Sequence, residues 1–263
     1  MNTDLEKRIA MGRSAIAAQT ELLHRSFGKV DSQWKHDGTR VTSVDLEISR
    51  RIFDTLGGEF PNDQLFSEES DHGPSKVTAR FAWILDPVDG TNNYALGIPM
   101  VAISLALLED GEPIYGFVYD LGTRCTTHGG PGSGLWVDDE PVKKREPDEW
   151  KETVIAMHSS IKTRHKPVVE AVRRKGIIRA FGSGALHLTH VALGRMDACL
   201  DFTIKVWDIA AAVALCRESG IEIHYLEESP FPLREFDVRM KSIAYLAARP
   251  EILEELKGCV PDT

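Results

Sequence analysis

The sequence has little of what marks membrane-spanning, secreted or zinc-finger proteins. No apolar run approaches the roughly 18 residues that a membrane-spanning helix requires, and residues 1–26 mix charges throughout instead of forming a signal peptide. Only four cysteines occur, and no two of them lie close together, so neither a disulfide framework nor a zinc site is expected. We therefore predict a cytoplasmic protein with reduced thiols and no membrane partner.

Basic residues are also in the minority. Lys and Arg total 31 against 40 Asp and Glu, which gives a net charge of −9. Such a balance argues against a broad nucleic-acid interface. With 263 residues, a hydrophobic content of 42% and no internal repeat or low-complexity tract, the chain can bury a large core. It should fold as one large domain or as two closely packed halves.

The expected elements change character near the middle of the chain. In the first half the patterns predict helices at 5–27 and 45–56, a polar mobile loop at 29–40, and strands at 41–44, 81–85, 101–108, 113–119 and 135–137. The stretch 142–150 is charged and poor in apolar residues, which marks a boundary. After it, strands at 154–157, 177–181, 197–201, 221–224 and 243–247 alternate with helices at 164–174, 185–193, 208–218 and 250–256. We therefore predict subdomains at 1–145 and 146–263.

The segment DPVDGT at 86–91 is the most informative motif. Asp86 and Asp89 follow the apolar run 81–85, so two hard oxygen ligands for a divalent cation come at the end of a buried strand. Gly90 lets the backbone approach closely, and the free N–H groups of the helix that opens there attract an anion. The segment can thus hold a metal and a phosphate together. Asp-Pro and Asp-Gly are also ordinary turn dipeptides, which leaves a purely structural interpretation open.

Acidic residues beside apolar runs occur in two further places. Glu68 and Glu69 follow the short apolar stretch 65–66, and Asp208 follows Trp207 at the start of the helical pattern 209–215. Carboxylates beside buried surface are costly unless they are paired or bind a metal. If these segments meet in space, the cluster predicts a bound cation.

Three segments together resemble a known family. SEES at 67–70, WILDPVDGTNNY at 83–94 and VWDIAAAVAL at 206–215 are similar to the signature segments of the inositol monophosphatase family, which are magnesium-dependent, lithium-sensitive phosphomonoesterases. The resemblance extends to 41–45, 182–202 and 242–253 and so covers most of the chain. It implies a mixed α/β fold, the five-layer αβαβα sandwich of the inositol monophosphatase / fructose-1,6-bisphosphatase type, usually found as a homodimer.

The resemblance also implies a set of metal ligands, most of them in the N-terminal subdomain. One Mg²⁺ would be bound by Glu68, Asp86 and the carbonyl of Val88. A second would be bound by Asp86, Asp89 and Asp208, and a weaker third would share Glu68, giving two to three ions per site as in other two-metal phosphatases. Li⁺ is then the expected inhibitor.

Catalytic and substrate contacts follow from the same resemblance. Thr91 with Asp45 is similar to the pair that orients the attacking water and accepts its proton, and Glu68 shares in activating that water. The N–H groups of Gly90 and Thr91 would hold the phosphate. Further predicted substrate contacts, all in the C-terminal subdomain, are Gly184, Ala185, Asp201 and Lys205.

Several residues near these segments keep alternative interpretations. Lys35 lies in the loop where the family carries a lysine near the metals, although an isolated loop lysine is typically a solvated charge. Glu69 can support the first metal indirectly or be an exposed turn carboxylate. Asp201 aligns with the acidic residue that contacts sugar hydroxyls, and otherwise is a plain aspartate at a strand end. His187 and His190, three residues apart, are expected to pack in the core.

The predicted function is hydrolysis of a small phosphorylated substrate. An inositol-1-monophosphatase-like enzyme acting on a polyol or sugar phosphate is favoured, and fructose-1,6-bisphosphatase, histidinol-phosphatase and nucleotide 3′-phosphatase activities are alternatives on the same fold. A regulatory binding protein of the family is an alternative of another class. Ser67, Ile221 and the loop 122–134 depart from the family pattern without removing a ligand, so the substrate preference stays open.

Overall fold

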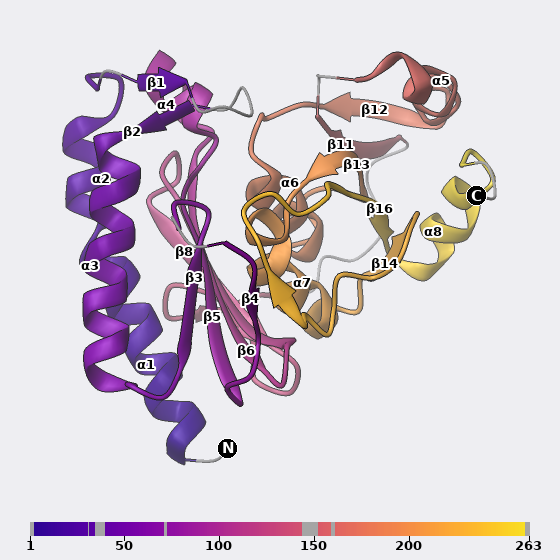
Figure 1. Ribbon diagram of the computed structural model, residues 1–263. Coiled ribbons are helices and arrows are strands. Elements are labelled where there is room, and N and C mark those ends of the chain that lie inside the picture. Colours follow the sequence, from indigo (N-terminus) through magenta and orange to yellow (C-terminus); the bar gives the residue numbers. More distant parts are fainter. Residues whose placement is uncertain are drawn as a thin grey trace.

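The chain folds into five layers of alternating helices and sheets (Figure 1). The computed structural model describes residues 3–30, 32–34, 40–70, 73–143, 152–158 and 161–260. Helices cover the outer faces of two sheets, and two further helices lie between the sheets. This arrangement confirms the predicted αβαβα sandwich.

The first two layers are a helical layer and a seven-stranded sheet. The helices are α1 (Thr3–Ala17), α2 (Thr20–Ser26) and α3 (Ser43–Glu59). The sheet has the order β10-β9-β8-β7-β6-β5-β3, formed by Glu140–Pro141, Gly134–Val137, Cys125–Gly130, Glu112–Asp120, Ala102–Glu109, Phe81–Asp89 and Gln64–Ser67. Neighbouring strands are antiparallel except β3, which runs parallel to β5.

Strand β5 is buried on both faces, which explains its continuous apolar sequence. Trp83 and Leu85 pack with the residues of the outer helices, whereas Ala82 and Ile84 pack with those of the central helices. Successive side chains of a strand point to opposite faces, so a strand between two helical layers needs apolar residues at every position. The strand is therefore held firmly, and its carboxyl end is a rigid place for functional groups.

The central layer and the second sheet form the other half of the sandwich. The central helices are α6 (Gly184–Ala192) and α7 (Val206–Ser219). The second sheet has the order β12-β11-β13-β16-β14, formed by Gly176–Arg179, Thr153–Met157, Ala198–Ile204, Ile243–Ala248 and Glu222–Tyr225. Helices α5 (Lys166–Arg173) and α8 (Pro250–Lys257) cover its outer face. Because α7 lies between two sheets, small residues such as Ala210 and Ala211 let the layers approach closely.

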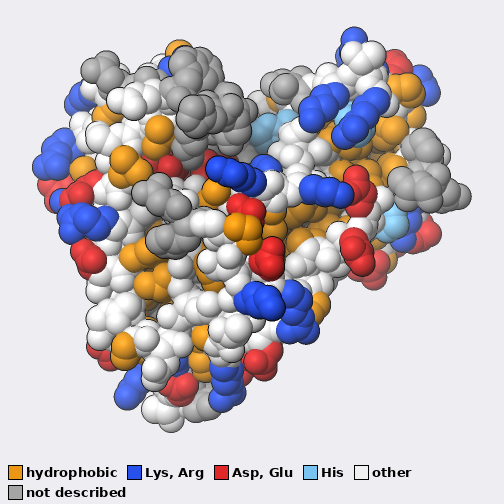
Figure 2. Space-filling model, viewed as in Figure 1, with side chains coloured by type: hydrophobic (Ala, Val, Ile, Leu, Met, Phe, Trp, Pro, Cys, Tyr) orange, Lys and Arg blue, Asp and Glu red, His pale blue; other side chains and the backbone are white. Residues whose placement is uncertain are grey.

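Short elements complete the fold. They are β1 (Ser32–Trp34) paired with β2 (Arg40–Thr42), β4 (Ser75–Lys76) paired with β15 (Glu235–Phe236), the helix α4 (Thr91–Leu96) and a 3-10 turn at Thr163–His165. On the face shown in Figure 2, acidic and basic side chains are scattered instead of forming one large field. None of the helices in the described ranges combines the length and apolar composition that crossing a bilayer requires.

The structure corrects several predicted boundaries. The helix expected at 5–27 is divided into α1 and α2, and the strand expected at 41–44 ends at Thr42, whose side chain caps α3. Part of the loop expected at 29–40 forms β1, and residues 35–39 lie outside the described ranges. Strand β5 continues to Asp89 instead of ending at Leu85. Strand β8 was not predicted, because its sequence CTTHGG is polar and rich in glycine.

The subdomain boundary at 145/146 stays a prediction, because residues 144–151 are not described. What the structure adds is that the halves share a core. Helix α7 follows the predicted boundary in the chain, yet it packs on β6 and β7 of the first sheet. The residues on α7 are therefore positioned against the end of β5.

Candidate metal and phosphate site

An irregularity in β5 brings Asp86 and Asp89 together. In a regular strand, residues three apart point to opposite faces of the sheet. Asp86 pairs with Ser104 and Asp89 with Ala102 on β6, and the register shifts between these two pairs. Such a bulge inserts an extra residue and turns the strand locally. Both carboxylates can therefore face the same cavity.

Carboxylates from three segments line that cavity. Asp86, Asp89 and Asp208 each offer an oxygen, and these oxygens lie within 4.8 Å of one another. Glu68, in the turn after β3, lines the same cavity, which has a volume of about 150 Å³. The other lining residues are Arg40, Val88, Gly90, Thr91, Asn92 and Gly182. The structure thus brings together the four carboxylates that were predicted from the sequence as metal ligands.

The electrostatics of the cluster are those of a cation site. Burial, reinforced by the charges of Glu68, Asp89 and Asp208, raises the pKa of Asp86 well above its usual value of 3.8. Burial and then the charge of Asp89 likewise raise the pKa of Asp208. Like charges this close cannot all ionise without a counter-charge. Four hard oxygen donors around a small cavity fit Mg²⁺ by size and chemistry.

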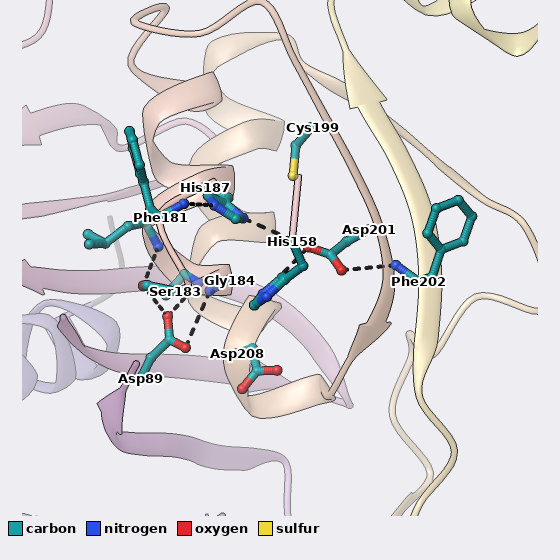
Figure 3. A network of polar contacts seen from close by, with 12 residues as sticks. Asp89, His158, Phe181, Ser183, Gly184, His187, Cys199, Asp201, Phe202 and Asp208 are labelled. Carbon is teal, nitrogen blue, oxygen red and sulfur yellow. Dashed lines mark hydrogen bonds and ion pairs between the residues drawn. The ribbon is translucent and has the colours of Figure 1, made fainter. Parts of the chain in front are cut away.

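Asp89 also joins the two halves of the molecule (Figure 3). Its carboxylate accepts hydrogen bonds from the Ser183 hydroxyl, from the Ala185 N–H at 2.7 Å and from the Gly184 N–H at 3.3 Å. These bonds oppose the effect of burial, which nevertheless raises the pKa of Asp89. The predicted substrate contacts at Gly184 and Ala185 stay predictions, because in this structure both N–H groups bind Asp89.

Thr91 and Asp45 lie together as the sequence predicted. The Thr91 hydroxyl donates to the Val88 carbonyl at 2.9 Å, and it lies 3.4 Å from Oδ1 of Asp45. Asp45 is fully buried near the start of α3, where Oδ2 accepts from the N–H and hydroxyl of Thr42. Helix capping therefore fixes this carboxylate beside the cavity. Its catalytic role stays a prediction.

Gly90 is required by the backbone at this position. Its φ is +91°, in the left-handed region that favours glycine. A Cβ added there would lie 2.7 Å from the Met100 carbonyl oxygen. Any side chain at this position would have to displace the backbone at Met100, just before β6. Steric constraints alone therefore explain why the motif has glycine at position 90, whether or not its N–H contacts a phosphate.

The remaining predicted residues occupy less decisive positions. The Lys205 N–H donates to Asp208 at 2.8 Å, whereas its ammonium group donates to the Met240 carbonyl. Glu69 follows Glu68 in the turn and does not line the cavity. Lys35 lies outside the described residues. The assigned roles of these three side chains stay predictions.

Some residues of the site were not predicted from the sequence. Arg40 and Asn92 line the cavity, and the Ser183 hydroxyl binds Asp89. Ser183 is the N-cap of α6, and its serine-before-helix pattern could have indicated the cap but not its partner 94 residues away. Arg40 offers no local signal, because it is simply the first residue of the short strand β2.

A larger cavity, of about 570 Å³, lies elsewhere. It is lined by the carboxyl-terminal ends of α6 and α7 and by the start of α8. Its lining mixes apolar residues with charged ones such as Glu218, Arg249 and Glu251, and it contains none of the predicted site residues. The smaller cavity is therefore the candidate site, because several buried carboxylates converge there.

Comparison with known proteins agrees with this fold. The sequence model of the inositol monophosphatase family matches residues 4–259, and the chain therefore belongs to the inositol monophosphatase family. The fructose-1,6-bisphosphatase/inositol-1-monophosphatase of Thermotoga maritima is 34% identical over 201 residues, covering 76% of this chain and 77% of that protein.

Two further similarities bear on fold and function. The solved structure of a Thermotoga maritima IMPase superposes with a TM-score of 0.81 and 27% sequence identity, covering 97% of this chain and 98% of that one. The Nus factor SuhB of Xylella fastidiosa is 31% identical over 219 residues, covering 80% of this chain and 78% of that protein. The family thus includes relatives named for catalysis and a relative named as a Nus factor.

Proposed function

We propose that the protein is a Mg²⁺-dependent phosphomonoester hydrolase that acts on a small polyol or sugar phosphate, in the manner of an inositol-1-monophosphatase. The observation that carries this proposal is the convergence of Asp86, Asp89 and Asp208 within 4.8 Å, with Glu68 on the same cavity. The relatives named for inositol-1-phosphate and fructose-1,6-bisphosphate hydrolysis support the substrate class.

Three groups of residues have separate proposed roles in hydrolysis: binding the metal, orienting the water and holding the phosphate. Glu68, Asp86, Asp89, Asp208 and the Val88 carbonyl would hold magnesium ions, which when bound supply an activated water and neutralise the phosphoryl oxygens. The Thr91 hydroxyl and the Asp45 carboxylate lie beside this cavity, where they would orient the attacking water and take up its proton. The N–H groups of Gly90 and Thr91 would hold the phosphate at the start of α4.

A substrate panel tests this proposal. We expect phosphate release from inositol 1-phosphate in the presence of Mg²⁺ and none after chelation with EDTA. Fructose 1,6-bisphosphate, histidinol phosphate and a nucleotide 3′-phosphate serve as rival substrates, ranked by kcat/KM. A folded protein that releases no phosphate from any of the four with Mg²⁺ would contradict the proposal.

Lithium inhibition is a separate expectation. A small monovalent cation can occupy the carboxylates of Asp86, Asp89 and Asp208 after hydrolysis and delay release of phosphate. Inhibition should then be uncompetitive with respect to substrate, because Li⁺ binds the enzyme only after hydrolysis, while phosphate is still bound. Initial rates measured over a matrix of Li⁺ and substrate concentrations give the pattern. Competitive inhibition, with the effect lost at high substrate, would exclude this mode.

A regulatory role is the second candidate, because one relative is named as a Nus factor. The two roles can be separated with Asp86→Asn, which alters the cavity and leaves the outer surface intact. A regulatory function independent of catalysis would persist in this variant, whereas phosphate release would be lost. The homodimer and the cytoplasmic location are predictions that sedimentation and cell fractionation would check.

A further inference from the structure

The segment 181–185, which connects β12 to α6, reaches the carboxylate cavity from the second half of the chain. Gly182 lines the cavity. The next three residues all donate hydrogen bonds to Asp89: the Ser183 hydroxyl and the Ala185 N–H to Oδ2, and the Gly184 N–H to Oδ1. Figure 3 shows Ser183 and Gly184 directed at this carboxylate. Whatever holds the segment therefore also determines how Asp89 is oriented.

These hydrogen bonds leave Asp89 with one oxygen for a cation. Each carboxylate oxygen has two lone pairs. On Oδ2 both lone pairs are used, one by the Ser183 hydroxyl and one by the Ala185 N–H. Among the described residues, Oδ1 accepts only from the Gly184 N–H, at 3.3 Å, and so keeps one lone pair. Asp89 can therefore bind a metal through Oδ1, and the direction of that oxygen depends on the segment.

Phe181 is bound by a side chain at each of its backbone polar groups. Nδ2 of Asn93 donates to the Phe181 carbonyl at 2.6 Å and to the Met100 carbonyl at 2.9 Å. The Phe181 N–H donates to Nε2 of His187 at 2.8 Å. Asn93 lies on α4, in the first half of the chain, whereas His187 lies on α6. The segment is thus attached to both halves immediately before Gly182.

Close packing surrounds these attachments. A Cβ on Gly182 would lie 3.0 Å from Nδ2 of Asn93, and a Cβ on Gly90 would lie 3.4 Å from the Gly182 carbonyl oxygen. The side chain of His187 is fully buried. An apolar side chain in its place would leave the Phe181 N–H without its acceptor, which is unfavourable for a polar group in the protein interior.

His187 also belongs to a cluster with His158 and Asp201. Nδ1 of His187 lies 3.8 Å and Nε2 of His158 lies 3.6 Å from Oδ2 of Asp201, a spacing that could suit a transition metal. Because Nε2 of His187 accepts from Phe181, the neutral ring carries its proton on Nδ1 and has no lone pair there for a metal. The cluster does not line the carboxylate cavity, and the predicted sugar contact of Asp201 stays a prediction.

We propose that Asn93 and His187 are positioning residues, which hold the segment 181–185 so that Oδ1 of Asp89 is directed at the bound cation. The proposal rests on the proposed function, because it takes the carboxylate cavity as the Mg²⁺ site. Groups that orient a metal ligand typically contribute roughly 10- to 100-fold to metal affinity. Asn93 and His187 act through Phe181, so we expect effects at the lower end of this range.

Mg²⁺ titration of metal-free variants tests the role of His187. We expect His187→Leu, which cannot accept from the Phe181 N–H, to raise the Kd for Mg²⁺ about tenfold. His187→Gln places an amide oxygen near the position of Nε2 and should keep a Kd close to that of the wild type. Thr189→Val is the matched control, because Thr189 is buried on the same helix and its hydroxyl has no partner among the described residues. Isothermal titration calorimetry gives each Kd, and circular dichroism checks each fold.

Asn93→Ala provides a second arm that leaves the core intact. Asn93 is only half-buried, and alanine suits its helix, so this variant should fold. It should also raise the Kd for Mg²⁺ about tenfold. Since Asn93 and His187 hold the same residue, the double variant with His187→Leu should lose less affinity than the product of the two single losses.

Three results would overturn this assignment. They are a folded Asn93→Ala protein with the wild-type Kd, a His187→Gln protein that binds as weakly as His187→Leu, and single losses that simply multiply in the double variant. The second result would show that packing of the ring matters instead of its acceptor. In all three cases the wild type still binds Mg²⁺ and the proposed function stands. A wild type that binds no Mg²⁺ would instead overturn the metal assignment itself.

Discussion

Asp86→Asn is expected to lower phosphate release by about a thousandfold or more, since several kcal/mol of metal-derived stabilisation would be lost. The same substitution should raise the melting temperature of the metal-free protein. Asp86 is 1% exposed and lies among the carboxylates of Glu68, Asp89 and Asp208. An amide is nearly isosteric and removes this repulsion, but it cannot supply the anionic oxygen that a cation requires.

The stabilisation should depend on pH in a defined direction. Burial and neighbouring charges raise the pKa of Asp86 in the folded protein well above 3.8. The folded protein therefore retains a proton that the unfolded chain releases as the pH rises above that value, and stability falls through this range. The melting-temperature advantage of Asp86→Asn should be small in acid and grow towards neutral pH. Thermal unfolding in EDTA at several pH values measures it.

Magnesium should reverse the order of stability. Ligand binding to the folded state raises the melting temperature of the wild type, and the variant should respond weakly. If Asp86→Asn destabilises the metal-free protein at neutral pH, or if its advantage does not change with pH, the carboxylates do not repel one another as described. Near-normal turnover of the variant would refute the metal assignment.

Gly116→Ala should lower the free energy of unfolding by about 3 kcal/mol, at the upper end of what overpacking usually costs. Gly116 is on β7, and a Cβ there would lie 2.1 Å from the Ala211 carbonyl oxygen of α7. Backbone atoms cannot rotate away as a side chain can, so the sheet and α7 must separate. Asp208 lies in the first turn of the same helix, and we therefore expect the variant to bind Mg²⁺ more weakly as well.

A second glycine provides the matched control. Gly58 is exposed near the end of α3, and a Cβ there would meet nothing within 4 Å. Gly58→Ala should be neutral or stabilise the protein by roughly 0.5 to 1 kcal/mol through helix propensity. Urea denaturation of both variants gives the comparison. Equal stability of Gly116→Ala and the wild type would mean that β7 and α7 are not in close contact in solution.

Sequence patterns predicted the features that depend on neighbouring residues in the chain, such as a buried strand and the acidic residues at its end. The apolar run 81–85 indicated a buried strand, and DPVDGT with the acidic residues at 68 and 208 indicated a cation site. These acidic residues come together only through packing between the layers of the fold. Hydrophobic periodicity does not predict that packing, whereas the resemblance to a known family implied it. The bulge in β5 was missed because Asp-Pro reads as the end of a strand, whereas pairing with β6 continues to Asp89.

The cluster of His158, His187 and Asp201 shows the limit of local patterns. His187 was expected to pack in the core, and it is indeed fully buried. Its hydrogen bond from Phe181 and its position beside Asp201 arise from the way α6 lies on β13. His158 lies in no recognisable sequence motif, so its place in this cluster was not predicted. Its position follows from the parallel pairing of β11 and β13, which no short stretch of sequence specifies.

Binding of Mg²⁺ to the metal-free protein, followed by isothermal titration calorimetry, tests the central claim most directly. The wild type should bind Mg²⁺ saturably, because Glu68, Asp86, Asp89 and Asp208 share one cavity. Asp86→Asn should show no saturable binding over the same concentration range, although its fold is intact. Identical isotherms for the two proteins would contradict the claim that this cluster of carboxylates is the metal site.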